Sequence, residues 1–317
     1  MTVPPRISFI IPVRNDPERL ERCLASVASS AATAELPAEV IVVDNGSTDA
    51  TPQVAREAGA RVLSAPGVTV ARLRNRGAEG ARGAILAFVD ADHTIGRGWA
   101  AAAAELLERP GVSAAGAPYR PPADGTWVQR TYDLLRAHPD GTVETQWLGS
   151  GNLAVRREAF EEAGGFDESL ATCADLDLCR RLREAGHTIV ADERLESVHH
   201  GDPATLGELF RAELWRGRDA LRFGLRVGWS LRNVVGTSLP VVTLLSVLAL
   251  VLSAALPYGR LVAALGAAGL LGVIGLRMVR MLRNARRRDL HTIAATLVVA
   301  TVYEIARAFA LLARPRR

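Results

Sequence analysis

The N-terminal part of the chain alternates short apolar segments with amphipathic ones, and this alternation constrains the fold more than any other feature. Short apolar runs at residues 7–13, 40–43, 60–65 and 84–92 predict strands. Between them, residues 18–30, 51–58 and 70–83 carry apolar positions at helical spacing. Strand, helix, strand, helix at this spacing predicts an α/β fold with a mostly parallel sheet flanked by helices.

Carboxylates follow two of the predicted strands. Asp44 ends the second strand, and Asp90 and Asp92 end the fourth with only Ala91 between them. In an open parallel sheet, ligands bind outside the carboxyl ends of the strands, so these acids should converge on one crevice. Two carboxylates that close repel each other and are expensive to desolvate, and a divalent cation would neutralise them.

Two common nucleotide-binding classes are disfavoured by the sequence. It contains no GxxxxGK[ST] pattern and no GxGxxG after the first strand. A P-loop nucleotidase and a classical dinucleotide dehydrogenase therefore lose their main support. A phosphate group could instead be held by a metal ion, because Mg²⁺ and Mn²⁺ take one or two protein carboxylates and borrow further ligands from substrate phosphates.

Five motifs in this order resemble family 2 glycosyltransferases of the GT-A fold, over roughly residues 6–200. They read ISFIIPVRND, EVIVVDNGSTDAT, RLRNRGAEGARGAILAFVDAD, GSGNLAVRREAFEEAGGFDESL and ADLDLCRRLREAG. The resemblance implies a Rossmann-like GT-A domain, a nucleotide-diphospho-sugar donor, Mg²⁺ or Mn²⁺ as cofactor, and inversion at the anomeric carbon.

The resemblance also assigns residues of the donor and metal sites. It places the donor on Pro12, Arg14, Asn15, Asp44, Arg74 and Asp90. Asp49, in the same turn as Asp44, is a weaker candidate and suits the cap of the next helix. The metal ligands it implies are Asp92, Asp90 and His199, with Asp92 the more direct of the two acids and His199 preferred over His200.

The general base should come from the later acidic motif. The family pattern Glu-Asp-x-Asp-Leu reads Ala174-Asp175-Leu176-Asp177-Leu178 here, so Ala174 replaces the glutamate and Asp175 keeps the position of the base. We expect Asp175 on a loop ahead of the next helix and Asp177 at the start of that helix, as a cap or near the acceptor. Gly151 and Asn152, in the GSGN motif, resemble residues near the sugar and the acceptor.

The C-terminal part of the chain is different in character. Residues 205–232 mix large apolar residues with arginines, which suits a basic amphipathic segment at a membrane surface. The uncharged run at residues 234–256 is long enough to span a bilayer, and a second span is predicted at about 261–282. The basic stretch that follows should be cytoplasmic by the positive-inside rule.

The last apolar segment, at about residues 292–313, has two interpretations. It contains Glu304 and Arg307, one helical turn apart, and is either a third span or an interfacial helix. A third crossing would place the basic tail outside, against the positive-inside rule. No secretory signal peptide is expected, because the first apolar run is too short. We therefore predict a multi-pass protein of the inner membrane with domains at 1–204 (catalytic, cytoplasmic), 205–232 (interfacial) and 233–317 (membrane).

The predicted activity is transfer of one sugar to a hydroxyl acceptor, lipid-linked or glycan, in the cell envelope. The Gln-x-x-Arg-Trp motif of processive synthases is absent, since its nearest match keeps only Trp215. Expected partners are the donor, the acceptor and membrane lipids, with no nucleic acid, and oligomerisation stays open. Two alternatives stay open as well: a membrane-anchored nucleotidyltransferase, and an inactive GT-A scaffold, which the replacement at Ala174 keeps in consideration.

Overall fold

The computed structural model describes residues 4–218, 224 and 231–313, and it divides into two compact units. The first unit comprises the chain up to Pro122 together with His138–Gly201. The second comprises Ala123–Ala137 and the chain from Asp202 onward. Residues 123–137, which the sequence analysis assigned to the catalytic domain, thus group with the C-terminal helices.

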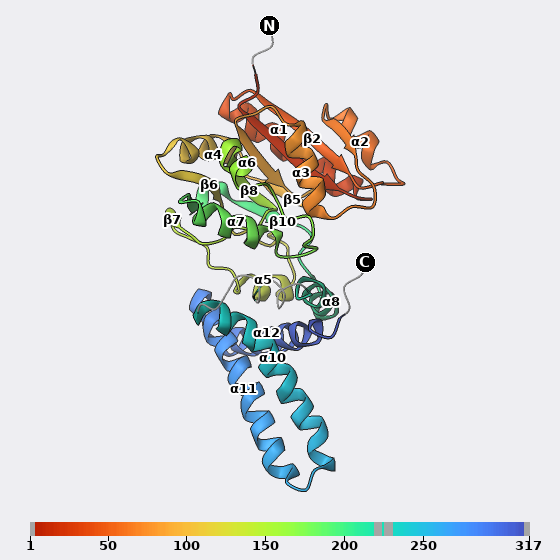
Figure 1. Ribbon diagram of the computed structural model, residues 1–317, viewed down its shortest axis with the longest axis vertical. Coiled ribbons are helices and arrows are strands. Elements are labelled where there is room, and N and C mark those ends of the chain that lie inside the picture. The colour runs from red at the N-terminus through yellow and green to blue at the C-terminus, as the bar shows by residue number, and fades with distance from the viewer. Residues whose placement is uncertain (1–3, 219–223, 225–230, 314–317) are drawn as a thin grey trace. The chain divides into compact units, whose positions relative to one another are not determined.

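The first unit is built on an eight-stranded sheet with the order β3-β2-β1-β4-β8-β6-β9-β7 (Figure 1). Strands β1 to β4 run parallel to one another, β6 runs parallel to β9, and β8 and β7 run antiparallel to their neighbours. The bounds are β1 Ile7–Val13, β2 Ala38–Asp44, β3 Arg61–Ser64, β4 Ile85–Val89, β6 Val112–Gly116, β7 Thr142–Glu144, β8 Asn152–Arg156 and β9 Thr188–Asp192. The predicted mostly parallel α/β sheet is confirmed.

Helices cover this sheet: α1 Pro17–Ala34, α2 Thr51–Glu57, α3 Val70–Gly80, α4 Trp99–Glu108, α6 Arg157–Glu162 and α7 Ala174–Glu184, with a short 3₁₀ turn at Glu193–Leu195. Helix α1 shows why such segments fold as they do. Asp16 caps it by accepting the N–H of Arg19, and its apolar stripe, which includes Leu20 and Val27, is buried against the sheet. The largest buried side chain of the core is Trp99, whose ring centroid lies 5.8 Å from that of Phe9.

A two-stranded antiparallel ribbon lies beside the end of β4. It pairs β5 (His93–Ile95) with β10 (Ser197–His199), and the register sets His93 directly opposite His199. The sequence predicted one strand through residue 92, but β4 ends at Val89 and the chain turns before β5 begins. The turn is closed by the N–H of His93, which donates to the carbonyl of Asp90 over 2.9 Å.

The second unit consists of helices: α5 Trp127–Asp133, α8 Leu206–Arg216, α10 Leu231–Leu252, α11 Gly259–Asn284 and α12 Leu290–Ala310, with a 3₁₀ turn at Ser253–Ala255. Three of them are long and apolar enough to cross a membrane, namely Ser238–Ala255, Gly259–Asn284 and Leu290–Ala310. They correspond to the three predicted apolar segments. Of the predicted amphipathic segment 205–232, residues 219–223 and 225–230 lie outside the described residues.

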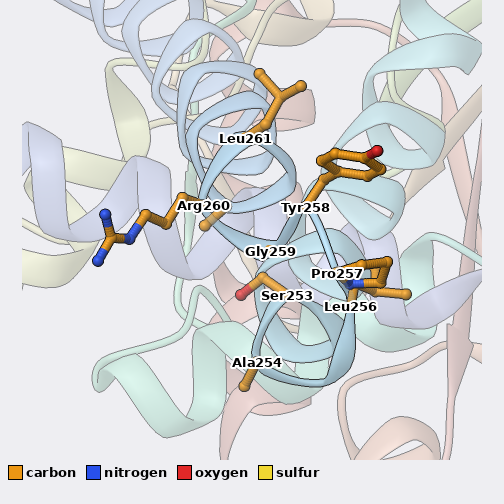
Figure 2. A pocket seen from close by; sticks show the side chains of 9 residues that line it. Ser253, Ala254, Leu256, Pro257, Tyr258, Gly259, Arg260 and Leu261 are labelled. Atoms are coloured by element: carbon orange, nitrogen blue, oxygen red, sulfur yellow. The ribbon is translucent and has the colours of Figure 1, made fainter.

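A shallow pocket opens at the turn between α10 and α11 (Figure 2). Leu256, Pro257, Tyr258 and Arg260 are among the side chains that line it. Its described lining contains no carboxylate, imidazole or thiol. The groups suited to metal binding and proton transfer are found instead in the first unit.

Candidate metal and catalytic site

The two acids of the Asp90-Ala91-Asp92 motif have different partners. The Arg74 guanidinium, of which 5% is exposed, donates from Nη2 to Asp90 Oδ1 over 2.5 Å. The N–H of Asp90 donates to the carbonyl of Gly151 at 3.2 Å, which fixes the turn against β8. Asp92 instead lies with two histidines, so the two acids have separate partners rather than one shared partner.

Asp92, His93 and His199 form the one group of three or more potential metal ligands found among the described residues. Their ligand atoms all lie within 4.8 Å of one another, and His199 Nε2 lies 3.1 Å from Asp92 Oδ2. Both histidines are buried. Burial alone would raise the pKa of Asp92, but the hydrogen bond and charge of His199 outweigh it and hold that pKa below its usual range.

This donor set fits a divalent cation. One carboxylate and two imidazoles give oxygen and nitrogen donors in one place. The second ring nitrogen of His93, Nδ1, lies 3.2 Å from Ser197 Oγ, a contact of the kind that orients metal-binding histidines. The ring of Tyr119 packs edge-on against both imidazoles, with centroids 5.0 and 4.7 Å away.

His93 was not among the predicted ligands, whereas Asp92 and His199 were. Asp90, which was predicted as a ligand, is not part of the group. The only signal for His93 was its position next to Asp92. The pairing of β5 with β10 brings His93 to the site, and no local sequence pattern predicts this contact between segments about 100 residues apart.

Two glycines border the acids closely. A Cβ atom on Gly201 would lie 2.0 Å from Asp92 Oδ2 and 3.0 Å from His199 Nε2. A Cβ atom on Gly151 would lie 2.6 Å from Asp90 Oδ2 and 3.1 Å from His93 Nε2. Gly151 was predicted as a sugar-binding or acceptor-binding residue, and the structure places its backbone directly against the site.

Asp175 lies in the first turn of α7, not on a loop ahead of it as predicted, because the helix already begins at Ala174. Its carboxylate accepts the N–H of Leu176 at 2.9 Å. Burial raises the pKa of Asp175, and the nearby charge of Arg74 opposes the rise only in part. A carboxylate with a raised pKa is a better proton acceptor near neutral pH, as a general base requires.

The prediction that Asp177 caps this helix is wrong. The cap position is Cys173, in a left-handed conformation with φ of 65° and without a side-chain cap, and Asp177 lies inside the helix. Asp177 accepts from Arg180 Nη2 at 2.9 Å and from Arg181 Nε at 2.8 Å. Arg181 also donates to the carbonyl of Gly165 at 2.6 Å, so Asp177 holds the loop before α7 in place.

Asn152 has a structural task that conflicts with its predicted contact to sugar or acceptor. It is fully buried, and its Oδ1 accepts from Trp99 Nε1 at 2.7 Å. Its Nδ2 donates to the carbonyls of Ala117 at 2.9 Å and Leu195 at 2.7 Å. With these bonds Asn152 ties β8 to the surrounding loops, and its side chain is not presented to a ligand.

The residues predicted to hold the nucleotide lie at the ends of β1 and β2. Pro12 is buried in β1, and Arg14 and Asn15 follow it in an exposed turn. The amide of Asn15 accepts the N–H of Thr48 at 2.8 Å, which joins the two loops. Asp44 is 5% exposed, and both of its oxygens accept the N–H of Ser47, at 3.2 and 3.1 Å. Asp49 accepts the N–H of Thr51, the first residue of α2, at 3.0 Å, but the cap position of α2 is Ala50 and it has no side-chain cap, so the predicted cap role of Asp49 is wrong.

The chain is similar to known glycosyltransferases in sequence and in fold. The profile described as Glycosyl transferase family 2 matches residues 8–164. The glycosyltransferase AglE of Haloferax volcanii is 28% identical over 74% of this chain and 79% of its own length. The N-acetylglucosaminyl-diphospho-decaprenol L-rhamnosyltransferase of Mycobacterium tuberculosis is 32% identical over 57% of this chain and 71% of its own length.

Among solved structures, the mannosyltransferase PcManGT from Pyrobaculum calidifontis, in complex with GDP-Man and Mn²⁺, superposes with a TM-score of 0.62. It is 21% identical, and the match covers 98% of this chain and 88% of that one. The sheet order, the helices that flank it and this match agree on the GT-A fold. The chain is an enzyme that belongs to family 2 of the glycosyltransferases.

Proposed function

We propose that the protein is an inverting glycosyltransferase that moves one sugar from a nucleotide-diphospho-sugar to a hydroxyl group of a lipid-linked acceptor. The observation that carries the proposal is the Asp92, His93 and His199 group at the end of β4, where a family 2 enzyme must hold the donor's diphosphate. The partly buried Asp175, with its raised pKa, supplies the second requirement, a base.

The donor set favours Mn²⁺ over Mg²⁺ as cofactor. Mg²⁺ prefers oxygen ligands in near-ideal octahedral geometry, whereas two of the three candidate ligands here are imidazoles. A cation on Asp92, His93 and His199 would supply Lewis-acid stabilisation of the diphosphate leaving group. Arg74 would hold Asp90 in a fixed orientation beside this site, through the 2.5 Å contact.

The reaction follows from the placement of Asp175. Its carboxylate takes the proton of the acceptor hydroxyl while the hydroxyl oxygen bonds to the anomeric carbon and the bond to the nucleotide diphosphate breaks. A positioned base contributes roughly 10² to 10⁴ in rate. Because Asp90 is committed to Arg74 and Asp92 to the histidines, Asp175 is the carboxylate best suited to this step, and a single displacement inverts the anomeric centre.

The acceptor class is inferred from the helices and from one relative. The three helices long and apolar enough to cross a membrane support a membrane location, and the name of the mycobacterial relative describes transfer to a sugar on decaprenol diphosphate. The name of the archaeal neighbour pairs a nucleotide sugar with Mn²⁺. A lipid-linked acceptor on the cytoplasmic face of the inner membrane is consistent with all of these.

A transfer assay on the full-length protein tests the proposal. Purified protein is incubated with a panel of nucleotide sugars, Mn²⁺ and polyprenyl-diphosphate-linked acceptors, and the anomeric configuration of the product is read by NMR. Asp92→Ala and Asp175→Asn should each lower turnover by about 10² or more. The exposed Asp140 provides the matched control, Asp140→Asn, which should leave turnover unchanged.

Asp177→Asn separates the two acids of α7. Asn keeps the polar contacts to Arg180 and Arg181 but loses the charge, so this variant should melt at lower temperature and retain substantial turnover. Full activity of Asp175→Asn, retention of the donor's anomeric configuration, or turnover in excess chelator would each refute the mechanism. Transfer of sugar to water-soluble acceptors but not to the lipid-linked ones would refute the acceptor class.

A further inference from the structure

Helix α12 carries an apolar stripe that no part of the described chain covers. Its exposed large side chains are Leu290, Ile293, Leu297, Val298 and Phe309, and Leu312 follows just after the helix. Other side chains of the helix are buried within the unit, among them Val299, Ala300 and Glu304. A contiguous set of large apolar side chains that stays exposed on a long helix marks a surface that contacts a partner or a membrane, and we infer below that this stripe faces lipid.

Contacts at both ends of α12 lead to the same short helix. Just before α12, Asn284 at the end of α11 donates from Nδ2 to the carbonyl of Leu134, after α5, over 2.9 Å. Near the C-terminal end of α12, Arg307 lies 3.8 Å from Glu213 of α8. Glu213 in turn accepts from the hydroxyl of Tyr132 in α5 at 2.6 Å. Tyr132 and Leu134 are two residues apart, so both ends of α12 lie close to the same short helix, α5, and at about the same depth relative to a membrane.

The pairing of α12 with α11 leads to the same conclusion. Arg277 Nε donates to Glu304 Oε1 over 2.6 Å. Arg277 is about 10 Å along α11 from Asn284, whereas Glu304 is about 21 Å along α12 from Leu290, at 1.5 Å per residue. An antiparallel span would bring Glu304 level with about residue 270 of α11. Helix α12 therefore crosses α11 steeply, as Figure 1 shows.

The level at which α12 lies is that of an aqueous surface. The C-terminal ends of α8 and α12 pack together at Gly217 and Ala310. Helix α8 carries four charged residues among its eleven and is not among the candidate spans. The end of α11 and the following loop bear exposed arginines at positions 280, 283, 286, 287 and 288. Such a cluster beside an apolar helix marks the cytoplasmic side and attracts anionic headgroups.

We propose that α12 is a monotopic helix, which rests its apolar stripe in the boundary between headgroups and acyl chains of the cytoplasmic leaflet. The chain then crosses the bilayer twice, through α10 and α11, and both of its ends are cytoplasmic. The partner of the stripe is the lipid surface, because α10 and α11 leave the same unit with exposed apolar side chains, such as Leu248 and Leu265, that only a bilayer would cover. From the sequence, this helix could be either a third span or an interfacial helix, and the proposal selects the second interpretation.

Thiol labelling of the full chain tests the topology. One variant places a cysteine at Tyr258, 76% exposed in the turn between α10 and α11, and another adds a cysteine after Arg317. A membrane-impermeant maleimide should label Tyr258→Cys in right-side-out vesicles only and the C-terminal cysteine in inverted vesicles only. The parent chain provides the blank for the native Cys23, Cys173 and Cys179. Labelling of both variants from the same side would overturn the two-span topology.

Spin labels test the lipid contact itself. Nitroxides at Leu290, Leu297 and Phe309 in reconstituted protein should all report one shallow depth, within about one helical turn, about 5 Å. A label at Leu265, on the exposed face of α11, serves as the reference for a spanning helix. A profile along α12 that passes through the bilayer centre would overturn the proposal. Labels that are shielded from both oxygen and a water-soluble relaxant would also overturn the proposal, because they would indicate that a second protein copy covers the stripe.

Discussion

Gly201→Ala is the sharpest perturbation of the candidate metal site, because it adds a single methyl group beside a ligand. The added Cβ would lie 2.0 Å from Asp92 Oδ2, and real Cβ contacts essentially never fall below 3.0 Å, so the carboxylate must move by about 1 Å. Metal–ligand distances hold to about 0.2 Å, so a shift of that size removes Asp92 from coordination distance. The backbone at Gly201 has no positive φ, so alanine itself is tolerated there.

The expected effect is a selective loss of metal affinity. Disturbing even the groups that orient metal ligands weakens binding by about 10 to 100-fold, and displacing a ligand should weaken it at least as much, which is about 1.4 to 2.7 kcal/mol or more. Folding stability should change little, because only the end of a side chain has to move and alanine restricts the unfolded chain. Binding is measured on the full-length protein from the free Mn²⁺ signal in EPR, with a melting curve alongside.

Gly149→Ala is the matched control, because the nearest atom to its added Cβ is Tyr119 Cε1 at 3.8 Å, an ordinary contact. It should bind Mn²⁺ as the wild type does. Unchanged Mn²⁺ affinity in Gly201→Ala would refute the assignment of Asp92 as a ligand. Equal losses in both variants would point to general disturbance of the loops and would refute the steric reasoning.

Three further outcomes are expected. The acid limb of the pH–rate profile should lie above the usual aspartate value of about 3.9, because burial raises the pKa of Asp175 and turnover falls as pH drops through that raised value. Burial raises the pKa of Asp192, but hydrogen bonds, led by that of Arg194, outweigh burial and lower this pKa to about 2. The variant Asp192→Asn should therefore lose about 2 kcal/mol of unfolding free energy at neutral pH. That gap should close as pH falls from about 4 to about 2, as melting curves would show. Glu304→Ala leaves Arg277 without its 2.6 Å partner and should destabilise the protein in detergent by about 3 to 5 kcal/mol. The double variant Arg277→Met with Glu304→Leu should recover most of this lost stability. Equal melting temperatures of the single and the double variant would contradict a coupled pair.

The parts of the fold that sequence predicted are those that local patterns determine. Apolar runs located β1, β2 and β4, acids follow β2 and β4, and the parallel arrangement of the strands then brings Asp44 and Asp90 to one edge of the sheet. Apolar composition likewise located the three long helices, because runs of bilayer length with few charges are typical of membrane segments.

The parts that failed depend on contacts between distant segments. His93 reaches the site only through the pairing of β5 with β10, and Asn152 is bonded to three segments that are far apart in the sequence, at Trp99, Ala117 and Leu195. The role of Asp177 was misjudged because the helix begins at Ala174, three residues before Asp177, and its cap is Cys173, which has a left-handed backbone and no side-chain cap. The grouping of residues 123–137 with the C-terminal helices had no signal in composition at all.

The ribbon of β5 and β10 has a consequence for how the enzyme is made. A cation held by Asp92 and His199 would join segments 107 residues apart, so it would act on the chain as a reversible cross-link. A covalent link closing a loop of about 100 residues restricts the unfolded chain by about 4.7 kcal/mol at 25 °C, and a metal clip of the same span acts in the same sense. Such a clip could not close until residue 199 had left the ribosome, so a nascent chain that needs the cation would be unable to engage the donor before nearly all of its catalytic unit had been synthesised.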